Sequence, residues 1–181
     1  MAHSYCDFAA QPDTAIVHRI YHDTAYGFPI HDDNELFGRF ILEINQAGLS
    51  WTTILNKQEN FRAAYAGFAI DAIAHFTDAD RERLLQDAGI IRNRLKVDAA
   101  IANAQTVLTL QQRFGSFKNW LDHHHPLPKA EWVKLFKKTF RFTGGEITGE
   151  FLMSTGYLPG AHSPSCPIYA EVLKCNPPFA G

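Results

Sequence analysis

The sequence predicts an all-α fold with one domain, and three observations support that prediction. The chain has 181 residues, of which 46% are hydrophobic, and this is enough for one sizeable core. Most segments repeat apolar residues at the spacing of one helix face, and patterns typical of strands are almost absent. No repeat, linker or low-complexity segment divides the chain. We therefore expect a single all-α domain over residues 1–181.

The helices are expected in chain order after an irregular segment at residues 1–32, which is rich in aromatic residues and histidine. Residues 33–46 carry apolar side chains at helical spacing, and Gly48 is expected to end that helix. A second helical stretch follows Trp51. Thr77 and the acidic residues after it are typical of a helix start, and this third helix is expected to end at a break. The break lies at residues 87–89, and further helices are predicted over residues 91–110, 117–122, 130–138 and 146–155.

Charge and composition limit the classes of partner. The formal charge of −2 and the pI near 6.5 give no overall nucleic-acid signature, so any positive surface for DNA must be local. No stretch approaches the roughly 20 apolar residues of a membrane span, and the first residues lack the basic lead and apolar run of a secretory signal. Three cysteines make a poor disulfide framework and are better explained as metal ligands or inert thiols. We therefore expect a cytoplasmic protein with no membrane partner.

A local positive segment surrounds Gly89, between the third helix and the next one. Glycine in a tight turn lets a phosphate approach the backbone, and the following helix offers unpaired N–H groups at the positive end of its dipole. Arg92, Arg94 and Lys96 would supply the charge that the chain as a whole lacks. The alternative is a glycine that ends one helix before an amphipathic helix with ordinary surface charges. These residues alone favour that structural interpretation.

Glu43 and three aromatic residues are candidates for a binding site. On the helix over residues 33–46, Glu43 falls at the edge of the apolar stripe, where a partly desolvated carboxylate needs a partner and is typical of functional sites. A glutamate at the rim that reaches back to solvent is the more common case and is favoured until a neighbour is found. Trp51, Tyr21 and Tyr26 offer flat rings for a slot that would accept a base, or could equally belong to the core.

The segment His-Ser-Pro-Ser-Cys at residues 162–166 raises the question of a metal site. Pro164 and Pro167 disfavour a continuous helix, so His162 and Cys166 are expected on a turn. Two ligands rarely hold zinc, which usually takes four in a structural site. The other ligands would have to come from elsewhere in the chain, and Cys175 has no assigned role.

Several motifs, in a shared order, resemble the DNA-3-methyladenine glycosylase I family. Over residues 20–105 the match includes Tyr21-His22-Asp23, the specific signature Gln-Ala-Gly-Leu-Ser-Trp at residues 46–51, and the hairpin at residues 87–94. Toward the C-terminus the match is reduced to residues 140–142, Gly144, Gly156, His162 and Cys166.

This resemblance implies a helix-hairpin-helix DNA glycosylase fold whose N- and C-terminal segments are joined by one structural zinc ion. The family's zinc ligands map onto Cys6, His22, His162 and Cys166. The resemblance also implies a base excision repair enzyme that acts as a monomer. Such an enzyme flips alkylated adenine, above all 3-methyladenine, out of double-stranded DNA and hydrolyses its N-glycosidic bond.

The resemblance assigns roles to individual residues. Glu43 matches the family's base-recognising glutamate and is the expected catalytic residue. The expected base-binding residues are Trp51, Tyr21 and Tyr26. The hairpin would contact DNA through Gly89, Ile90, Arg92 and Lys96. The family is thought to lack the water-activating aspartate of related glycosylases, so no general base is assigned.

The sequence departs from the family pattern at several positions. Tyr26 stands where tryptophan is usual, Ala25 where an acid is usual, and Phe8 replaces another common tryptophan, while Glu146 and Ser154-Thr155 interrupt the C-terminal pattern. Several of these would line the pocket, so the lesion range is left open. Two alternatives remain: a non-catalytic or altered-specificity homologue that binds lesions or nucleosides, and a zinc hydrolase with an exchangeable water on its metal.

Overall fold

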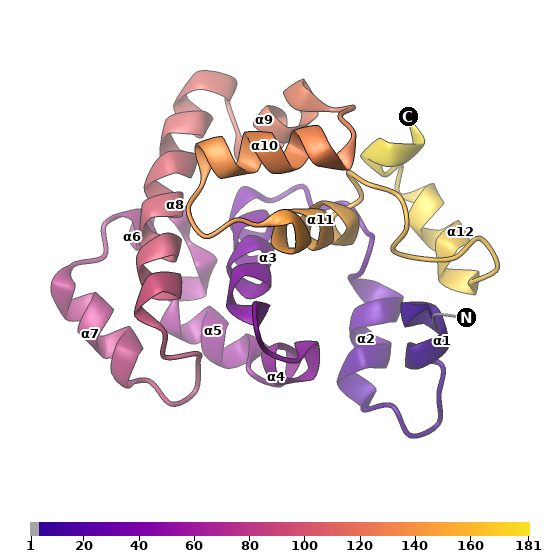
Figure 1. Cartoon of the computed structure of the whole chain (residues 1–181), viewed down its shortest axis with the longest axis horizontal. Coiled ribbons are helices and arrows are strands. Elements are labelled where there is room, and N and C mark those ends of the chain that lie inside the picture. The colour runs from indigo at the N-terminus through magenta and orange to yellow at the C-terminus, as the bar shows by residue number, and fades with distance from the viewer. Residues whose placement is uncertain (1–3) are drawn as a thin grey trace.

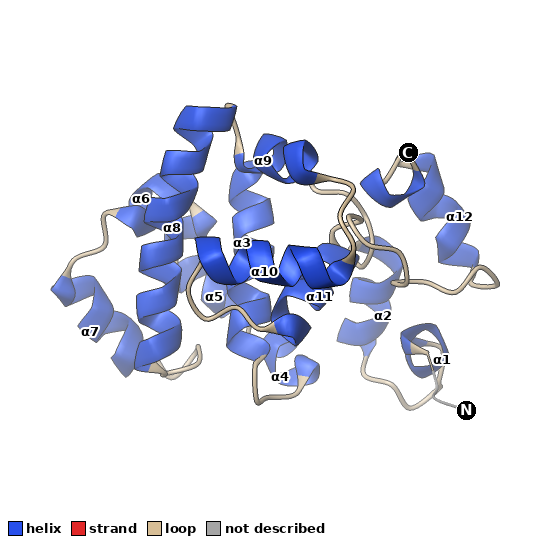
Figure 2. Cartoon of the chain, turned by 45° about the horizontal axis from the view of Figure 1, so that its top comes forward, coloured by secondary structure: helices blue, strands red, loops and turns tan. Residues whose placement is uncertain are grey.

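The computed structural model describes residues 4–181, which fold into α-helices joined by loops (Figure 2). The first helices are α1 (Tyr5–Ala9), α2 (Ile16–Thr24), α3 (Asp33–Gln46), α4 (Trp51–Asn56), α5 (Gln58–Ala64), α6 (Ile70–Ala74) and α7 (Asp78–Gln86). They are followed by α8 (Arg94–Phe114), α9 (Phe117–His124), α10 (Lys129–Thr139), α11 (Gly145–Ser154) and α12 (Pro167–Lys174), with short 3-10 helices at Ala66–Phe68 and Pro178–Ala180. No strand occurs among these described residues, which confirms the all-α prediction. Over the same residues, no helix has the length and apolar character needed to cross a bilayer.

Helix α3 runs through the middle of the molecule and packs against helices on several sides (Figure 1). Most of its side chains are buried, and the rings of Phe140 and Phe151 lie 5.0 Å from the ring of Phe40. Phe40 is fully buried in the main core, to which α6, α8, α9, α10 and α11 also contribute. Because Phe151 belongs to α11, this aromatic contact fixes α3 and α11 relative to each other.

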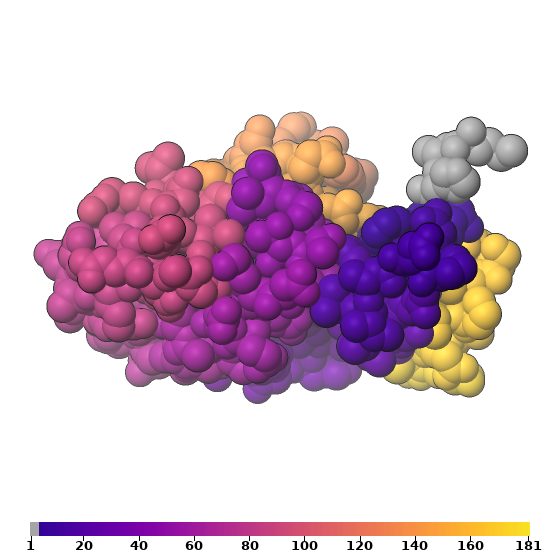
Figure 3. Space-filling model, turned by 90° about the horizontal axis from the view of Figure 1, so that it is seen from below, coloured from indigo at the N-terminus to yellow at the C-terminus, as the bar shows by residue number. Residues whose placement is uncertain are grey.

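The two ends of the chain lie side by side, with α1 and α2 against the segment around α12 (Figure 3). The amide of Gly27, just after α2, donates to the Ser154 carbonyl at 2.8 Å. Gly27 has a φ of +83°, and a Cβ there would lie 2.8 Å from the Cβ of Ala161, so only glycine fits. This close approach brings the turn at residues 162–166 up to α1 and α2.

The prediction that residues 1–32 are irregular is wrong, because α1 and α2 form within them. Helix α2 buries His18, Tyr21 and His22 and exposes its isoleucines, so its apolar residues do not mark its inward face. Helix α1 has only five residues and starts with a capping box, in which Ser4 and Asp7 exchange hydrogen bonds.

Other predictions hold within one or two residues, and the exceptions have local causes. The helix over residues 33–46 is confirmed, and α10 and α11 are each displaced by one residue at most. Helix α8 begins at Arg94, three residues later than predicted, because the Asn93 side chain accepts the Lys96 amide at 3.1 Å and caps the helix. Pro167 starts α12, which was not predicted, since proline is favoured in the first turn of a helix.

Candidate functional site

A cavity of about 720 Å³ opens between α2, α3, α4 and the start of α11. The structure brings the predicted Glu43, Tyr21, Tyr26 and Trp51 together in its wall. Their positions come from different elements: α3 carries Glu43, α2 carries Tyr21, and Trp51 is the first residue of α4. Phe8, Ser154 and Thr155 are not among the lining residues, whereas Tyr26 and Glu146 are. Two of the departures from the family pattern therefore lie in the cavity wall.

The three aromatic residues form one connected group. The Tyr21 ring lies 5.2 Å from Trp51 in an edge arrangement and 5.5 Å from Tyr26. Tyr5 of α1, which sequence reasoning missed, adds a fourth ring 5.1 Å from that of Tyr26. Tyr21 and Tyr26 are buried in a small cluster apart from the main core. These rings therefore pack on one another and also line the cavity. The two predictions for them, part of a hydrophobic cluster or wall of a base-binding slot, are compatible.

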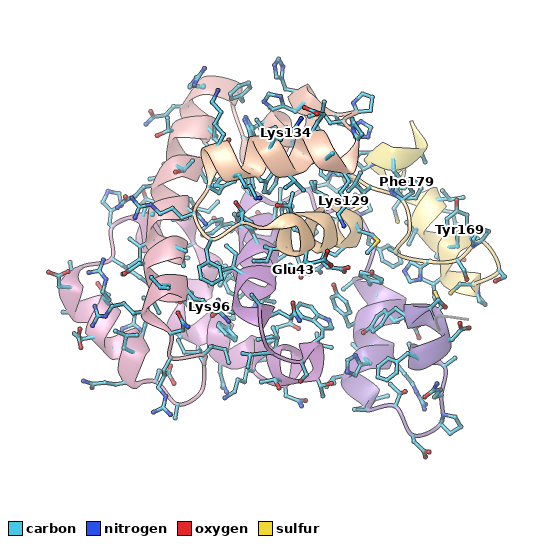
Figure 4. All side chains as sticks on the ribbon, in the orientation of Figure 1. Glu43, Lys96, Lys129, Lys134, Tyr169 and Phe179 are labelled. Atoms are coloured by element: carbon cyan, nitrogen blue, oxygen red, sulfur yellow. The ribbon has the colours of Figure 1, made fainter. Side chains whose placement is uncertain are left out.

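Glu43 is 4% exposed and lies beside α11 near the middle of the molecule (Figure 4). This placement contradicts the favoured interpretation of a rim glutamate that reaches solvent. Burial raises the pKa of Glu43 to about 8, an effect that the charge of Arg39 opposes and that of Glu150 reinforces. No salt bridge within residues 4–181 involves Glu43. Its carboxyl group therefore lines the cavity without a paired charge.

Arg39 lies one helical turn before Glu43 and holds the neighbouring wall. Its guanidinium lies 5.1 Å from the centre of the Tyr21 ring and donates to the Tyr21 hydroxyl at 3.4 Å and the Ser154 carbonyl at 3.3 Å. Arg39 is thereby occupied with Tyr21 and the end of α11. Its charge opposes the rise in the pKa of Glu43, but the two side chains form no ion pair within residues 4–181.

Most of the cavity wall formed by α11 could not be predicted from the sequence. The lining residues without a predicted role are Tyr5, Gln46, Ala47, Gly48, Gly144, Gly145, Glu146, Ile147 and Glu150. Glu146 was noticed only as a departure from the family pattern. Helix α11 is short and mostly apolar, so its sequence does not indicate which side faces a cavity.

The predicted hairpin is present as α7, a turn and α8. Ile90 is 3% exposed and anchors the turn in the core, while the Asp87 carboxylate accepts the Gly89 amide at 2.7 Å. Asn60 donates to the Gly89 carbonyl at 3.2 Å. Arg92 is exposed and forms no hydrogen bond or ion pair that the structure describes. Arg92 is therefore the cation of this turn that is available to a ligand, since Arg94 pairs with Glu82 at 3.2 Å.

The expectation that Lys96 contacts DNA phosphate needs correction. Lys96 is 4% exposed, and its ammonium donates to the carbonyl oxygens of Asn45 and Ala47, each at 2.7 Å (Figure 4). Those carbonyls belong to the C-terminal end of α3, where helix carbonyls have no partner within the helix and favour a cation. Lys96 therefore points inward from α8 and caps α3.

Cys6, His22, His162 and Cys166 form a cluster apart from the cavity, with four ligand atoms within 4.8 Å of one another. His162 Nδ1 lies 3.2 Å from His22 Nε2, and each sulfur lies 3.7 Å from one histidine nitrogen. The second nitrogen of each ring is engaged elsewhere: His22 Nδ1 with Asp23 at 2.7 Å, and His162 Nε2 with the Tyr26 carbonyl at 2.7 Å. Those bonds leave an unprotonated nitrogen of each ring facing the sulfurs, as in metal sites. The cluster could hold a metal ion.

Comparison with known proteins agrees with this geometry. The family model described as methyladenine glycosylase matches residues 11–134. DNA-3-methyladenine glycosylase 1 of Escherichia coli (strain K12) is 35% identical, over 82% of this chain and 89% of that protein. DNA-3-methyladenine glycosylase of Haemophilus influenzae (strain ATCC 51907 / DSM 11121 / KW20 / Rd) is 32% identical, over 81% and 89% respectively.

Solved structures of similar proteins have the same fold. 3-Methyladenine DNA glycosylase I from Staphylococcus aureus, solved to explain 3-methyladenine recognition, superposes with a TM-score of 0.80 at 29% identity and covers 91% of this chain and 97% of that one. A variant of 3-methyladenine DNA glycosylase I in complex with 3-methyladenine gives a TM-score of 0.79 at 29% identity, over 90% and 97%. The matched motifs, the fold and the cavity are consistent with one another, and the chain belongs to the methyladenine glycosylase family.

Proposed function

We propose that this protein is a DNA-3-methyladenine glycosylase that hydrolyses the N-glycosidic bond of 3-methyladenine in double-stranded DNA. The observation that carries the proposal is Glu43, a buried carboxyl group that forms no ion pair within residues 4–181 and lies in a cavity lined by Tyr21, Tyr26 and Trp51. The cavity volume of about 720 Å³ lies within the roughly 300–1,000 Å³ of small-molecule sites, so a flipped base can enter it.

The chemistry of the lesion matches the cavity. Alkylation at N3 places a positive charge on adenine, which weakens the bond to the sugar and makes the base a good leaving group. Aromatic faces attract a cation by roughly 0.5–2 kcal/mol each, and a carboxylate in a desolvated site adds charge-assisted hydrogen bonds to the purine. Unmodified adenine is neutral and therefore gains neither the cation–π attraction nor the attraction between opposite charges. The site therefore captures the cation and needs little further activation.

The reaction proceeds by departure of the base. The N-glycosidic bond breaks with its electron pair passing to the base, which leaves as neutral 3-methyladenine. Water adds to C1′ of the sugar and gives up a proton to solvent. Glu43, held on the rigid helix α3, orients the purine and stabilises its positive charge while the flipped nucleotide is held in position.

The hairpin between α7 and α8 is the proposed DNA contact. Arg92 supplies a free charge for a phosphate, and the turn at Gly89 and Ile90 presents the backbone to it. Ile90 supports this contact by anchoring the turn in the core. Lys96 has no direct part in it.

Zinc is the metal that the four-residue cluster fits best. With Zn–S bonds of about 2.3 Å and Zn–N bonds of about 2.0–2.1 Å, a tetrahedral site separates its nitrogens by roughly 3.3 Å and each nitrogen from a sulfur by roughly 3.6 Å. The corresponding distances of 3.2 Å and 3.7–3.8 Å agree. Cys6, His22, His162 and Cys166 would hold the ion, which supplies a structural link between the chain ends. Four protein ligands leave no place for a catalytic water, which argues against a zinc hydrolase.

The test is incubation of the protein with methylated double-stranded DNA, followed by chromatographic identification of any released purine. Release of 3-methyladenine is expected. Tight binding to the methylated DNA with no released purine would instead identify a non-catalytic homologue that recognises lesions.

A further inference from the structure

A second carboxyl group, that of Glu150 on α11, lines the same cavity as Glu43 and has no part in the function proposed above. Burial raises the pKa of Glu150, and Glu146 reinforces this, while Lys129 and the Tyr26 hydroxyl oppose it. The charge of Glu150 contributes to the raised pKa of Glu43. No salt bridge among residues 4–181 neutralises Glu43, Glu146 or Glu150.

The wall that carries Glu150 packs against the main core. Phe151, the next residue, lies with its ring 5.0 Å from that of Phe40 on α3, and this aromatic packing holds α11 against α3. Tyr26, whose hydroxyl opposes the rise in the pKa of Glu150, is itself 6% exposed and packed between Tyr5 and Tyr21. Glu150 and Tyr26 therefore share one wall of the cavity.

Lys129, the cation that lowers the pKa of Glu150, does not line the cavity. Lys129, at the start of α10, is exposed and crosses the backbone of α11 at Gly149 (Figure 4). A Cβ at Gly149 would lie 2.6 Å from the Lys129 Cε atom and 2.8 Å from its Nζ atom. Lys129 is absent from the lining residues, so its ammonium does not pair with Glu43 or Glu150 inside the cavity. A proton or a cationic ligand can therefore neutralise these two carboxyl groups.

We propose that Glu150 is a specificity-determining residue, whose carboxylate in the cavity wall presents a second negative charge to a cationic purine held by Glu43. Recognition from α3 and from α11 makes the site selective for the positive charge of an alkylated base over neutral adenine of similar shape. A neutral purine gains the same stacking but little from Glu150. The inference rests on the proposed function and adds a residue to its site.

The experiment measures binding of two small purines to the full-length protein. One is the permanent cation 3,9-dimethyladeninium, in which a methyl group replaces the sugar, and the other is neutral 9-methyladenine. Wild-type protein is expected to prefer the cation. Glu150→Gln should lower affinity for the cation about tenfold and leave that for the neutral purine unchanged. Glu150→Asp, which keeps the charge, should recover part of the preference. Glu131→Gln removes an exposed charge on α10, outside the cavity, and should behave as wild type.

The outcomes separate the inference from the function beneath it. If Glu150→Gln keeps the wild-type ratio of affinities for the cation and the neutral purine, and the wild-type melting temperature, the role of Glu150 is overturned. The glycosylase proposal is then unaffected. Equal loss for both purines also overturns the role of Glu150, because Glu150 would then act through cavity shape. Failure of wild-type protein both to prefer the cation and to release a base from methylated DNA counts against the proposed function itself.

Discussion

Lys96 on α8 donates a hydrogen bond of 2.7 Å to the carbonyl oxygen of Ala47, the residue that follows α3. A second bond of 2.7 Å to Asn45 completes this cap. Ala47 lines the cavity, and the adjoining loop leads to Trp51 at the start of α4. Lys96, a basic residue in the first turn of α8, therefore supports the cavity wall.

Replacing Lys96 should destabilise the fold. In Lys96→Met two carbonyls lose their charged donor within a buried site, and each unsatisfied group costs about 1–3 kcal/mol, so a loss of about 2–6 kcal/mol in the free energy of unfolding is expected. Urea denaturation measures it. Lys134→Met, which removes an exposed lysine of α10, should change stability by less than about 0.5 kcal/mol. If Lys96→Met has the same free energy of unfolding as the wild type, the cap does not contribute to stability.

Reversing the charge of Arg92 should weaken DNA binding to the same degree on every sequence. A phosphate contact carries no sequence information, and its loss should also reduce the salt dependence of binding by about one counterion. Titration of labelled duplexes at several salt concentrations gives both quantities for Arg92→Glu. Arg113→Glu makes the same charge change at the far end of α8 and is the control. If the affinity of the two variants depends on salt concentration to the same degree, the hairpin has a purely structural role.

Glu43→Gln should slow base release while leaving the fold intact. The change keeps the shape, removes the charge and reverses part of the hydrogen-bond pattern, which should cost about 2–4 kcal/mol, or roughly 30-fold to 1,000-fold in rate. Single-turnover release of 3-methyladenine measures the loss, and melting temperatures check the fold. Glu131→Gln serves again as the charge-matched control. If Glu43→Gln and the wild type release the base at equal rates, Glu43 has no role in base release.

Binding of the 3,9-dimethyladeninium cation should strengthen as pH rises toward 8. Burial raises the pKa of Glu43 from 4.5 to about 8, so most of the free protein carries a proton there at pH 7. A cation favours the ionised carboxylate, so binding must release that proton at a cost that shrinks as pH approaches the pKa. Affinity measured between pH 6 and 9 should rise and then level off above about 8 in the wild type. Glu43→Gln should lack the part of this rise in affinity that comes from ionisation of Glu43. The same dependence of affinity on pH in both proteins would show that Glu43 is not the titrating group.

One zinc ion per chain should be found in protein purified without chelators. Structural zinc contributes on the order of 10 kcal/mol of apparent binding free energy, so Cys166→Ser should lower the melting temperature strongly and lose the metal. Cys175→Ser, which changes an exposed cysteine outside the cluster, should retain both. Elemental analysis and thermal denaturation report the result. Metal-free wild-type protein with undiminished stability would exclude a structural metal.

The sequence by itself determined the features that depend on local chemistry. Helical spacing located α3, α10 and α11 nearly to the residue, because it acts within a few positions of the chain. The prolines correctly indicated a turn at His162 and Cys166. Family motifs then selected Glu43 and the aromatic residues that the structure brings to one cavity.

Only the tertiary structure decided which way several side chains face. Lys96 and Arg92 lie four positions apart on a basic segment and are alike in sequence, yet one caps α3 from within while the other stays exposed. Glu150 joins Glu43 because aromatic packing places α11 against α3, a contact between residues more than a hundred positions apart. The free energy of burying or exposing a charge depends on these distant neighbours, and no local pattern of residues contains that information.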